Sequence, residues 1–150
     1  MGIAAIDNLK QRLIDLKEKM PEITIEVARR NEAGAVDLIT QNQLSQGVDS
    51  DDAVILPKYT PFTVRKKKQK GQEHRFVTLH DKGDYYGSIK LRFGTPTTSW
   101  LFLVYATDWK AQKLETKYGA EILGLSPTSL EMFNDLIRAE LITEIQKSLL

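Results

Sequence analysis

Apolar residues recur every three or four positions along the first part of the chain. These residues are Ile3, Ile6, Leu9, Leu13, Leu16 and Met20. The spacing places them on one face of an amphipathic helix, and Pro21 is expected to end that helix. A second, longer helix is predicted from Glu22 to about Leu44, because apolar residues again recur at helical spacing, with Gly47 as its C-terminal cap.

Two short segments in the middle of the chain are predicted to form an antiparallel pair of strands. Ile89–Phe93 alternates apolar and polar residues, which is typical of a half-buried strand. Trp100–Tyr105 is rich in bulky and aromatic residues and is expected to be its partner, joined through a turn at 94–99. Just before the first strand, Asp81–Ser88 is expected to form a tight turn or one short helix capped by Asp84.

The last third of the chain is predicted to be helical. Asp108–Tyr118 reads as a helix that Asp108 caps and Gly119 ends. Ser126 followed by Pro127 is a strong start signal for the final helix. Its apolar face comprises Leu130, Phe133, Ile137, Leu141, Ile145 and Leu149. The fold expected is therefore α+β, a small, mainly antiparallel sheet packed against an N-terminal helix pair and a long C-terminal helix.

Length and composition favour one ordinary globular domain over residues 1–150. The chain is 41% hydrophobic and has a net charge of +1, and it contains no cysteine, which excludes disulfides and fits a reducing compartment. An acidic residue, Asp7, interrupts the first apolar stretch too early for a signal peptide. The longest apolar run, Trp100–Ala106, is far too short to span a membrane, so no membrane partner is expected.

Although the net charge of the chain is close to zero, one segment contains a dense run of cationic residues. It comprises Arg65, Lys66, Lys67, Lys68, Lys70 and, slightly later, Arg75. The segment is polar, and Gly71 follows it, so we expect a basic surface loop at about 63–75. Three roles fit such a loop: a solvated surface segment, a docking site for an acidic protein, or a contact with DNA. No aromatic residues interleave the lysines, as a stacking platform for bases would require.

No residue set for catalysis, a metal or a cofactor can be assembled from the sequence. The two histidines, His74 and His80, have no cysteine partners and no HExxH pattern. Asp49–Asp52 resembles the start of a calcium loop, but Val54 replaces the required glycine and Thr60 the required glutamate. No glycine-rich phosphate loop or nucleophile elbow is present. We therefore expect that the protein is not an enzyme.

The order of several segments resembles a group of small tailed-bacteriophage proteins, the tail-completion, minor tail or virion-morphogenesis (neck) proteins. The segments that carry the resemblance are Leu56–Thr63 followed by lysines, then Leu79–Ile89, then two short strands, Tyr118–Gly119 and a terminal helix. The match covers about Asn31 to Leu150. Lys82 stands where the group usually has threonine, and Glu121–Leu125 replaces its usual approach to the last helix.

The resemblance implies a structural role. Such proteins form rings, as a hexamer or a dodecamer, at the head–tail joint of the virion, after assembly in the host cytoplasm. The partners implied are further copies of the chain and the tail tube, tail terminator or connector (portal) proteins, with genomic DNA passing through the lumen. Tyr85, Tyr86 and Trp109 lie near predicted surface turns and are candidate interface anchors, with core packing as the alternative. The alternative function is a nucleic-acid-binding module that uses the basic segment 65–75.

Overall fold

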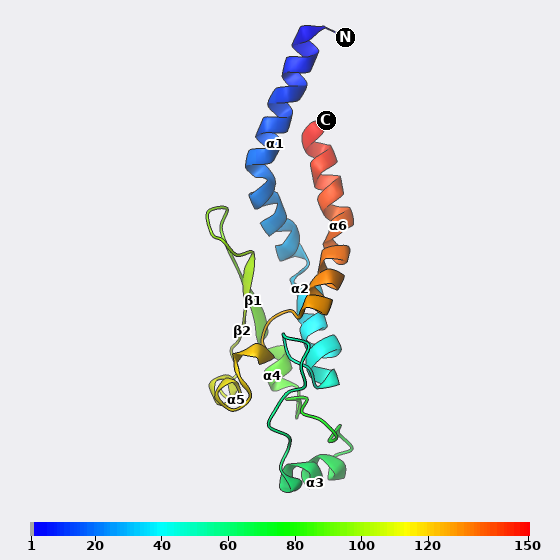
Figure 1. The fold of residues 1–150 in the computed structure, drawn as a ribbon, viewed down its shortest axis with the longest axis vertical. Coiled ribbons are helices and arrows are strands. Elements are labelled where there is room, and N and C mark those ends of the chain that lie inside the picture. Colours follow the sequence, from blue (N-terminus) through cyan, green and yellow to red (C-terminus); the bar gives the residue numbers. More distant parts are fainter. Residues whose placement is uncertain (1) are drawn as a thin grey trace.

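Two long helices, one from each end of the chain, lie antiparallel and side by side, and the remaining elements gather at one end of this pair (Figure 1). The computed structural model describes residues 2–150. The elements in chain order are α1 (Ile3–Arg30), α2 (Glu32–Asp37), the π-helical turn η1 (Leu38–Gln43), the 3-10 turn η2 (Leu44–Gln46), α3 (Pro61–Gln69), α4 (Asp84–Gly87), β1 (Ile89–Phe93), β2 (Phe102–Ala106), α5 (Ala111–Tyr118), the 3-10 turn η3 (Ala120–Ile122) and α6 (Pro127–Leu149).

The predicted α+β class is confirmed. Strands β1 and β2 form a two-stranded antiparallel sheet in which Ile89 pairs with Ala106 and Phe93 with Phe102. Strand β1 has the predicted bounds, with Ile89 and Leu91 buried. Strand β2 begins two residues later than predicted, at Phe102. The amide of Gly94 donates to the carbonyl of Leu101 (2.8 Å) and closes the hairpin loop at 95–100.

The prediction that Pro21 ends the first helix was wrong. Helix α1 continues through Pro21 to Arg30, because its apolar face continues into the buried Val27 and the packing against α6 stabilises the helix on the far side of the proline. The break comes at Asn31, whose side-chain amide donates to the carbonyl of Val27 (2.8 Å) and so competes with the helix. Gly47 caps the following helical segment in a left-handed conformation (φ +74°), as predicted.

The starts of two helices also differ from the prediction. Gly83, with φ +93°, precedes α4, and the Asp84 side chain makes no capping hydrogen bond. Helix α5 begins at Ala111 and not at Asp108, whose carboxylate instead accepts from the amide of Lys110 (2.8 Å) in the preceding turn. The last helix begins as predicted, since the Ser126 hydroxyl accepts from the amide of Ser129 (3.1 Å) and Pro127 occupies the first helical position.

Buried side chains from α1, α2, β1 and α6 form the core that fixes the long helices to the sheet. This cluster comprises Val27, Ala28, Ala35, Leu91, Phe133 and Ile137. The Phe133 ring lies edge-on to the ring of Phe102, with centroids 5.7 Å apart. A second cluster, which includes Ile39, Leu44, Val77 and Ile122, anchors the segments around α4 and α5.

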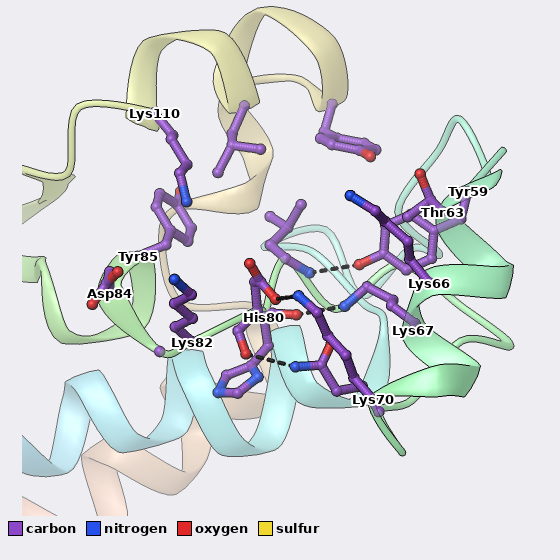
Figure 2. A pocket seen from close by; sticks show the side chains of 16 residues that line it. Tyr59, Thr63, Lys66, Lys67, Lys70, His80, Lys82, Asp84, Tyr85 and Lys110 are labelled. Atoms are coloured by element: carbon purple, nitrogen blue, oxygen red, sulfur yellow. Dashed lines mark hydrogen bonds and ion pairs between the residues drawn. The ribbon is translucent and has the colours of Figure 1, made fainter.

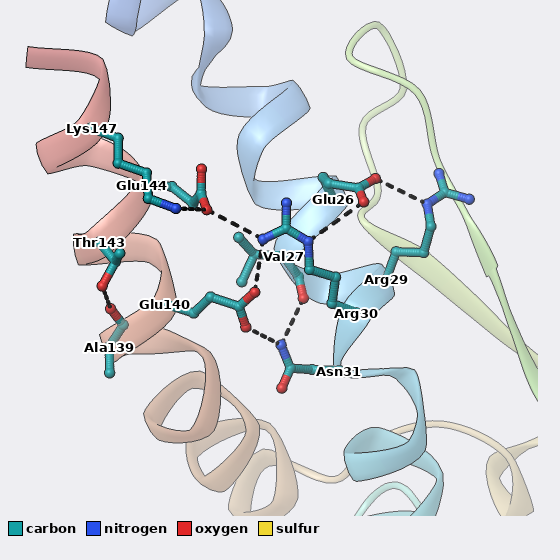
Figure 3. Close-up of polar contacts among 10 residues, drawn as sticks. All are labelled: Glu26, Val27, Arg29, Arg30, Asn31, Ala139, Glu140, Thr143, Glu144 and Lys147. Carbon is teal, nitrogen blue, oxygen red and sulfur yellow. Dashed lines mark hydrogen bonds and ion pairs between the residues drawn. The ribbon is translucent and has the colours of Figure 1, made fainter.

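An ion-pair network joins α1 to α6 beside this core (Figure 3). Arg30 Nη1 lies 2.9 Å from a carboxylate oxygen of Glu140 and 3.3 Å from one of Glu144. Asn31 donates to the other oxygen of Glu140 (2.8 Å). Hydrogen bonds from Asn31 and Arg30 hold the pKa of Glu140 below its usual range, and Arg30 does the same for Glu144.

This network predicts a dependence of stability on pH. Because the folded-state pKa values of Glu140 and Glu144 are depressed, the carboxylates stabilise the fold above their unfolded pKa of about 4.3, and this contribution is lost as pH falls through the folded values. In Arg30→Met the melting temperature should fall less between neutral pH and about pH 3 than in the native protein. Arg138→Met, which removes an exposed pair with Asp135, is the matched control. Equal pH profiles for all three proteins would contradict the prediction.

Candidate functional site

The basic segment is largely helical, which corrects the predicted loop at 63–75. Thr60 caps α3, because its hydroxyl accepts from the amide of Thr63 (3.3 Å), and Pro61 occupies the first helical position. Lysine and arginine are good helix formers, so the run that follows extends the helix. Helix α3 lies at the end of the molecule farthest from the two chain termini (Figure 1).

The six predicted cations do not share one environment. Arg65, Lys66 and Lys68 are exposed on α3, and Lys70 is exposed at its C-terminal cap. Lys67 is buried, with 8% of its surface exposed, and donates to the carbonyl of His80. Arg75 lies outside α3 and is bound by Glu73, with Nη2 2.8 Å from a carboxylate oxygen, and this contact lowers the pKa of Glu73 to about 2.

A lysine-lined cavity of about 280 Å³ opens between α3, the segment 79–84, α4 and α5 (Figure 2). Five lysines line it: Lys66 and Lys67 from α3, Lys70 from the C-terminal cap of α3, Lys82 from the loop before α4, and Lys110 from the turn before α5. Figure 2 shows the side chains of Lys66, Lys82 and Lys110 directed toward the same space from three different parts of the chain. Lys82 and Lys110 were not among the predicted site residues.

Two aspartates moderate the charge of the cavity. Lys70 pairs with Asp81 (2.8 Å), and this hydrogen bond is the main reason that the pKa of Asp81 is lowered. Asp84 also lines the cavity. Within residues 2–150, neither Lys66, Lys82 nor Lys110 forms an ion pair with a carboxylate, so the cavity keeps an excess of positive charge.

Tyr85 lies in the wall of this cavity. Only 5% of the residue is exposed, and its buried hydroxyl has no hydrogen-bond partner among the residues described. Burial, with a smaller contribution from Glu115 and Asp108, raises the pKa of this hydroxyl, so it stays protonated near neutral pH and keeps a free donor.

The three aromatic residues predicted as interface anchors have different environments. Tyr85 packs inside the chain, which leaves it little surface for a protein partner. Tyr86 is half-buried, and its hydroxyl donates to the carbonyl of Thr78 (2.6 Å) while its ring lies edge-on to His80. Trp109 is 75% exposed. Its role as an anchor stays a prediction.

Apolar side chains also remain uncovered on the two long helices. On α1 the predicted stripe is exposed over its first half, where Ile3 is 79%, Leu9 51% and Leu13 48% exposed. Helix α6 ends level with Arg12, which donates to the carbonyls of Leu149 and Leu150, so the start of α1 extends beyond it (Figure 1). The exposed apolar residues of α6 are Leu130, Met132, Leu136 and Ile142. The sequence predicted the stripe on α1 but gave no sign that it would stay exposed.

The described part of the chain contains no cluster of three histidine or carboxylate side chains able to hold a metal ion. His80 and Asp81 line the cavity, but Asp81 binds Lys70 and His80 packs on Tyr86. Over residues 2–150, no helix has both the length and the apolar composition that crossing a bilayer requires.

Comparisons with protein-family models, curated proteins and solved structures gave no match to this chain.

Proposed function

We propose that the protein is a ring-forming structural subunit at the head–tail joint of a tailed phage, a tail-completion or neck protein that attaches the tail to the connector. The observation that carries this proposal is the pair of uncovered apolar faces on α1 and α6. A ring needs two different complementary surfaces on each subunit, and one chain offers both. The resemblance in segment order supports the virion setting.

The spacing on α1 is suited to packing against another helix. Ile6, Leu9, Leu13, Leu16 and Met20 alternate steps of three and four residues, which is the heptad pattern of coiled coils. The same stripe continues to Ile23 and Val27, which already pack in the cluster shared with α6. The exposed half of α1 therefore presents the kind of surface that its buried half uses within the chain.

Charge favours α6 of a neighbouring copy as the partner of this stripe, and disfavours a second α1. The positions that flank the exposed stripe are Lys10, Arg12, Lys17 and Lys19, which would face like charges in an α1–α1 pair. On α6, the exposed Met132 and Leu136 are bordered by Glu131 and by Asp135, of which Asp135 also pairs with Arg138 (3.1 Å). Contact between α1 of one copy and α6 of the next joins unlike surfaces, which is the head-to-tail geometry of a ring.

The proposal predicts that Leu9→Glu with Leu13→Glu abolishes self-association and docking on tail tubes or connectors. Both leucines are about half exposed, so the variant should fold. Burial of two leucines contributes several kcal/mol, so the dissociation constant should rise at least about a hundredfold. Sedimentation across protein concentrations, alone and with purified tails, measures it. Asn8→Glu with Gln11→Glu adds the same charge outside the stripe and is the matched control.

Two results would overturn the proposal. One is a native protein that stays monomeric at all concentrations and also fails to bind tails or connectors. The other is a Leu9 and Leu13 double variant that assembles as well as the control.

Phe62 gives a specific reason to test the second candidate function, binding of nucleic acid by α3. Its ring is 64% exposed, and the Lys66 ammonium lies 5.1 Å from the ring centroid, so α3 presents an aromatic surface beside three exposed cations. This function predicts that labelled DNA binds with an affinity that falls steeply as salt rises, measured by fluorescence anisotropy. Phe62→Ala should weaken binding, while Phe76→Ala, outside α3, should not. If no DNA binds at low salt, nucleic-acid binding by α3 is excluded.

A further inference from the structure

We propose that the lysine-lined cavity binds a phosphate monoester or free phosphate, with the Tyr85 hydroxyl and the ammonium groups of Lys66, Lys82 and Lys110 as its donors. This site is independent of the helix faces that would join neighbouring subunits. The proposal stands on the excess charge of the cavity, the unpaired buried hydroxyl and the convergence of donors from separate elements.

The charge balance of the cavity fits a dianion. Five lysines and two aspartates line it, and only Lys70 and Asp81 among them form an ion pair. Lys67 is occupied by the carbonyl of His80. That bond leaves the charge of Lys67 in place, so the lining carries an excess of three positive charges, which Glu115 and Asp108 partly offset near the Tyr85 hydroxyl. A phosphate monoester carries close to two negative charges at neutral pH, whereas a carboxylate carries one.

The donors also fit the shape of a phosphoryl group. Lys66, Lys82 and Lys110 approach from α3, from the loop before α4 and from the turn before α5 (Figure 2). A phosphoryl group offers three terminal oxygens that accept hydrogen bonds from several directions. The Tyr85 hydroxyl is a protonated donor with no other partner in residues 2–150, and a buried donor left unpaired costs free energy that a bound oxygen would recover.

The cavity is suited to a terminal phosphate and not to the backbone of a duplex. Its volume of about 280 Å³ is near the lower limit of small-molecule pockets. A backbone phosphodiester carries one charge and is attached on both sides, so it cannot bring its phosphorus down to a hydroxyl as buried as that of Tyr85. Two sources share the required chemistry: free phosphate or a small phosphate ester, and the 5′-terminal phosphate of a nucleic-acid strand.

The test titrates the full chain with inorganic phosphate by calorimetry, in chloride buffers of matched ionic strength. Saturable binding at millimolar phosphate or below is expected. Tyr85→Phe removes only the unpaired hydroxyl, and Lys82→Met changes an exposed side chain, so both should fold. Each variant should weaken binding about tenfold or more, since a hydrogen bond to a charged group is lost. Lys90→Met, which removes an exposed lysine of β1 outside the cavity, should change affinity less than about twofold.

A second arm distinguishes the two sources. Tight binding of a 5′-phosphorylated oligonucleotide with weak binding of inorganic phosphate assigns the site to strand ends, and comparable binding of both assigns it to small phosphates. The proposal is overturned if neither ligand saturates, if the unphosphorylated oligonucleotide binds equally well, if Lys90→Met weakens binding as much as Lys82→Met, or if Tyr85→Phe leaves the affinity unchanged.

Discussion

Replacing Phe133 with alanine is expected to lower the free energy of unfolding by about 3–5 kcal/mol, because it leaves a cavity at the centre of the helix–sheet core. The Phe133 side chain is fully buried on α6 and lies edge-on to Phe102 of β2, so it joins the C-terminal helix to the sheet. Urea unfolding followed by circular dichroism measures the loss. The loss is a substantial part of the roughly 5–15 kcal/mol by which a folded domain is normally stable.

The matched control for Phe133→Ala is Phe62→Ala. Phe62 is 64% exposed on α3, so its removal should change stability by less than about 0.5 kcal/mol. If the two variants lose the same stability, Phe133 does not hold the place in the core that its burial indicates.

The elements predicted correctly are those whose signals are local. Helix α6 starts at a serine cap followed by proline, and β1 alternates buried and exposed residues, so neither depends on distant contacts. Helix α3 carries the same kind of start signal at Thr60 and Pro61. Its dense charge instead favours the prediction of a solvated loop, and that prediction fails because lysine is a good helix former.

The elements predicted wrongly are those that distant contacts decide. Pro21 is a local signal to end a helix, but the packing of Val27 against α6, more than a hundred residues away, carries α1 past it to Arg30. Helix α1 ends instead at Asn31, whose side-chain amide donates to the carbonyl of Val27 and to the carboxylate of Glu140.

In the candidate site, too, the residues visible in the sequence are those with local signals, and the missed ones depend on distant contacts. The cations of α3 were visible as a run in the sequence, whereas Lys82 and Lys110 are separated from them along the chain and join them only through the fold. No pattern in the sequence indicates that the Tyr85 hydroxyl would be buried without a partner. The exposure of the apolar stripe on α1 could not be predicted from the sequence either. Periodicity shows which residues share a face of a helix but not what covers that face.

Gln43→Met is expected to destabilise the protein by about 2–5 kcal/mol, although it replaces a polar side chain with an apolar one of similar length. Gln43 is 1% exposed at the end of η1. Its amide donates to the carbonyl of Gly124 (2.9 Å) and accepts from the amide of Ser126 (2.9 Å), the residue that caps α6. Methionine fills the space but leaves the buried amide of Ser126 and the partly buried carbonyl of Gly124 unpaired. An unpaired buried group costs about 1–3 kcal/mol.

Two measurements separate this mechanism from a general loss of packing. Urea unfolding gives the stability, and amide hydrogen exchange should show that the Ser126 amide loses protection by more than the global loss accounts for. Gln46→Met, at an exposed position of η2, should change stability by less than about 0.5 kcal/mol. Equal stability of the two variants would mean that the bonds from Gln43 contribute nothing net. Because Gln43 bridges the N-terminal helical segments to the start of α6, its loss should also loosen the joint on which the α1–α6 pair depends.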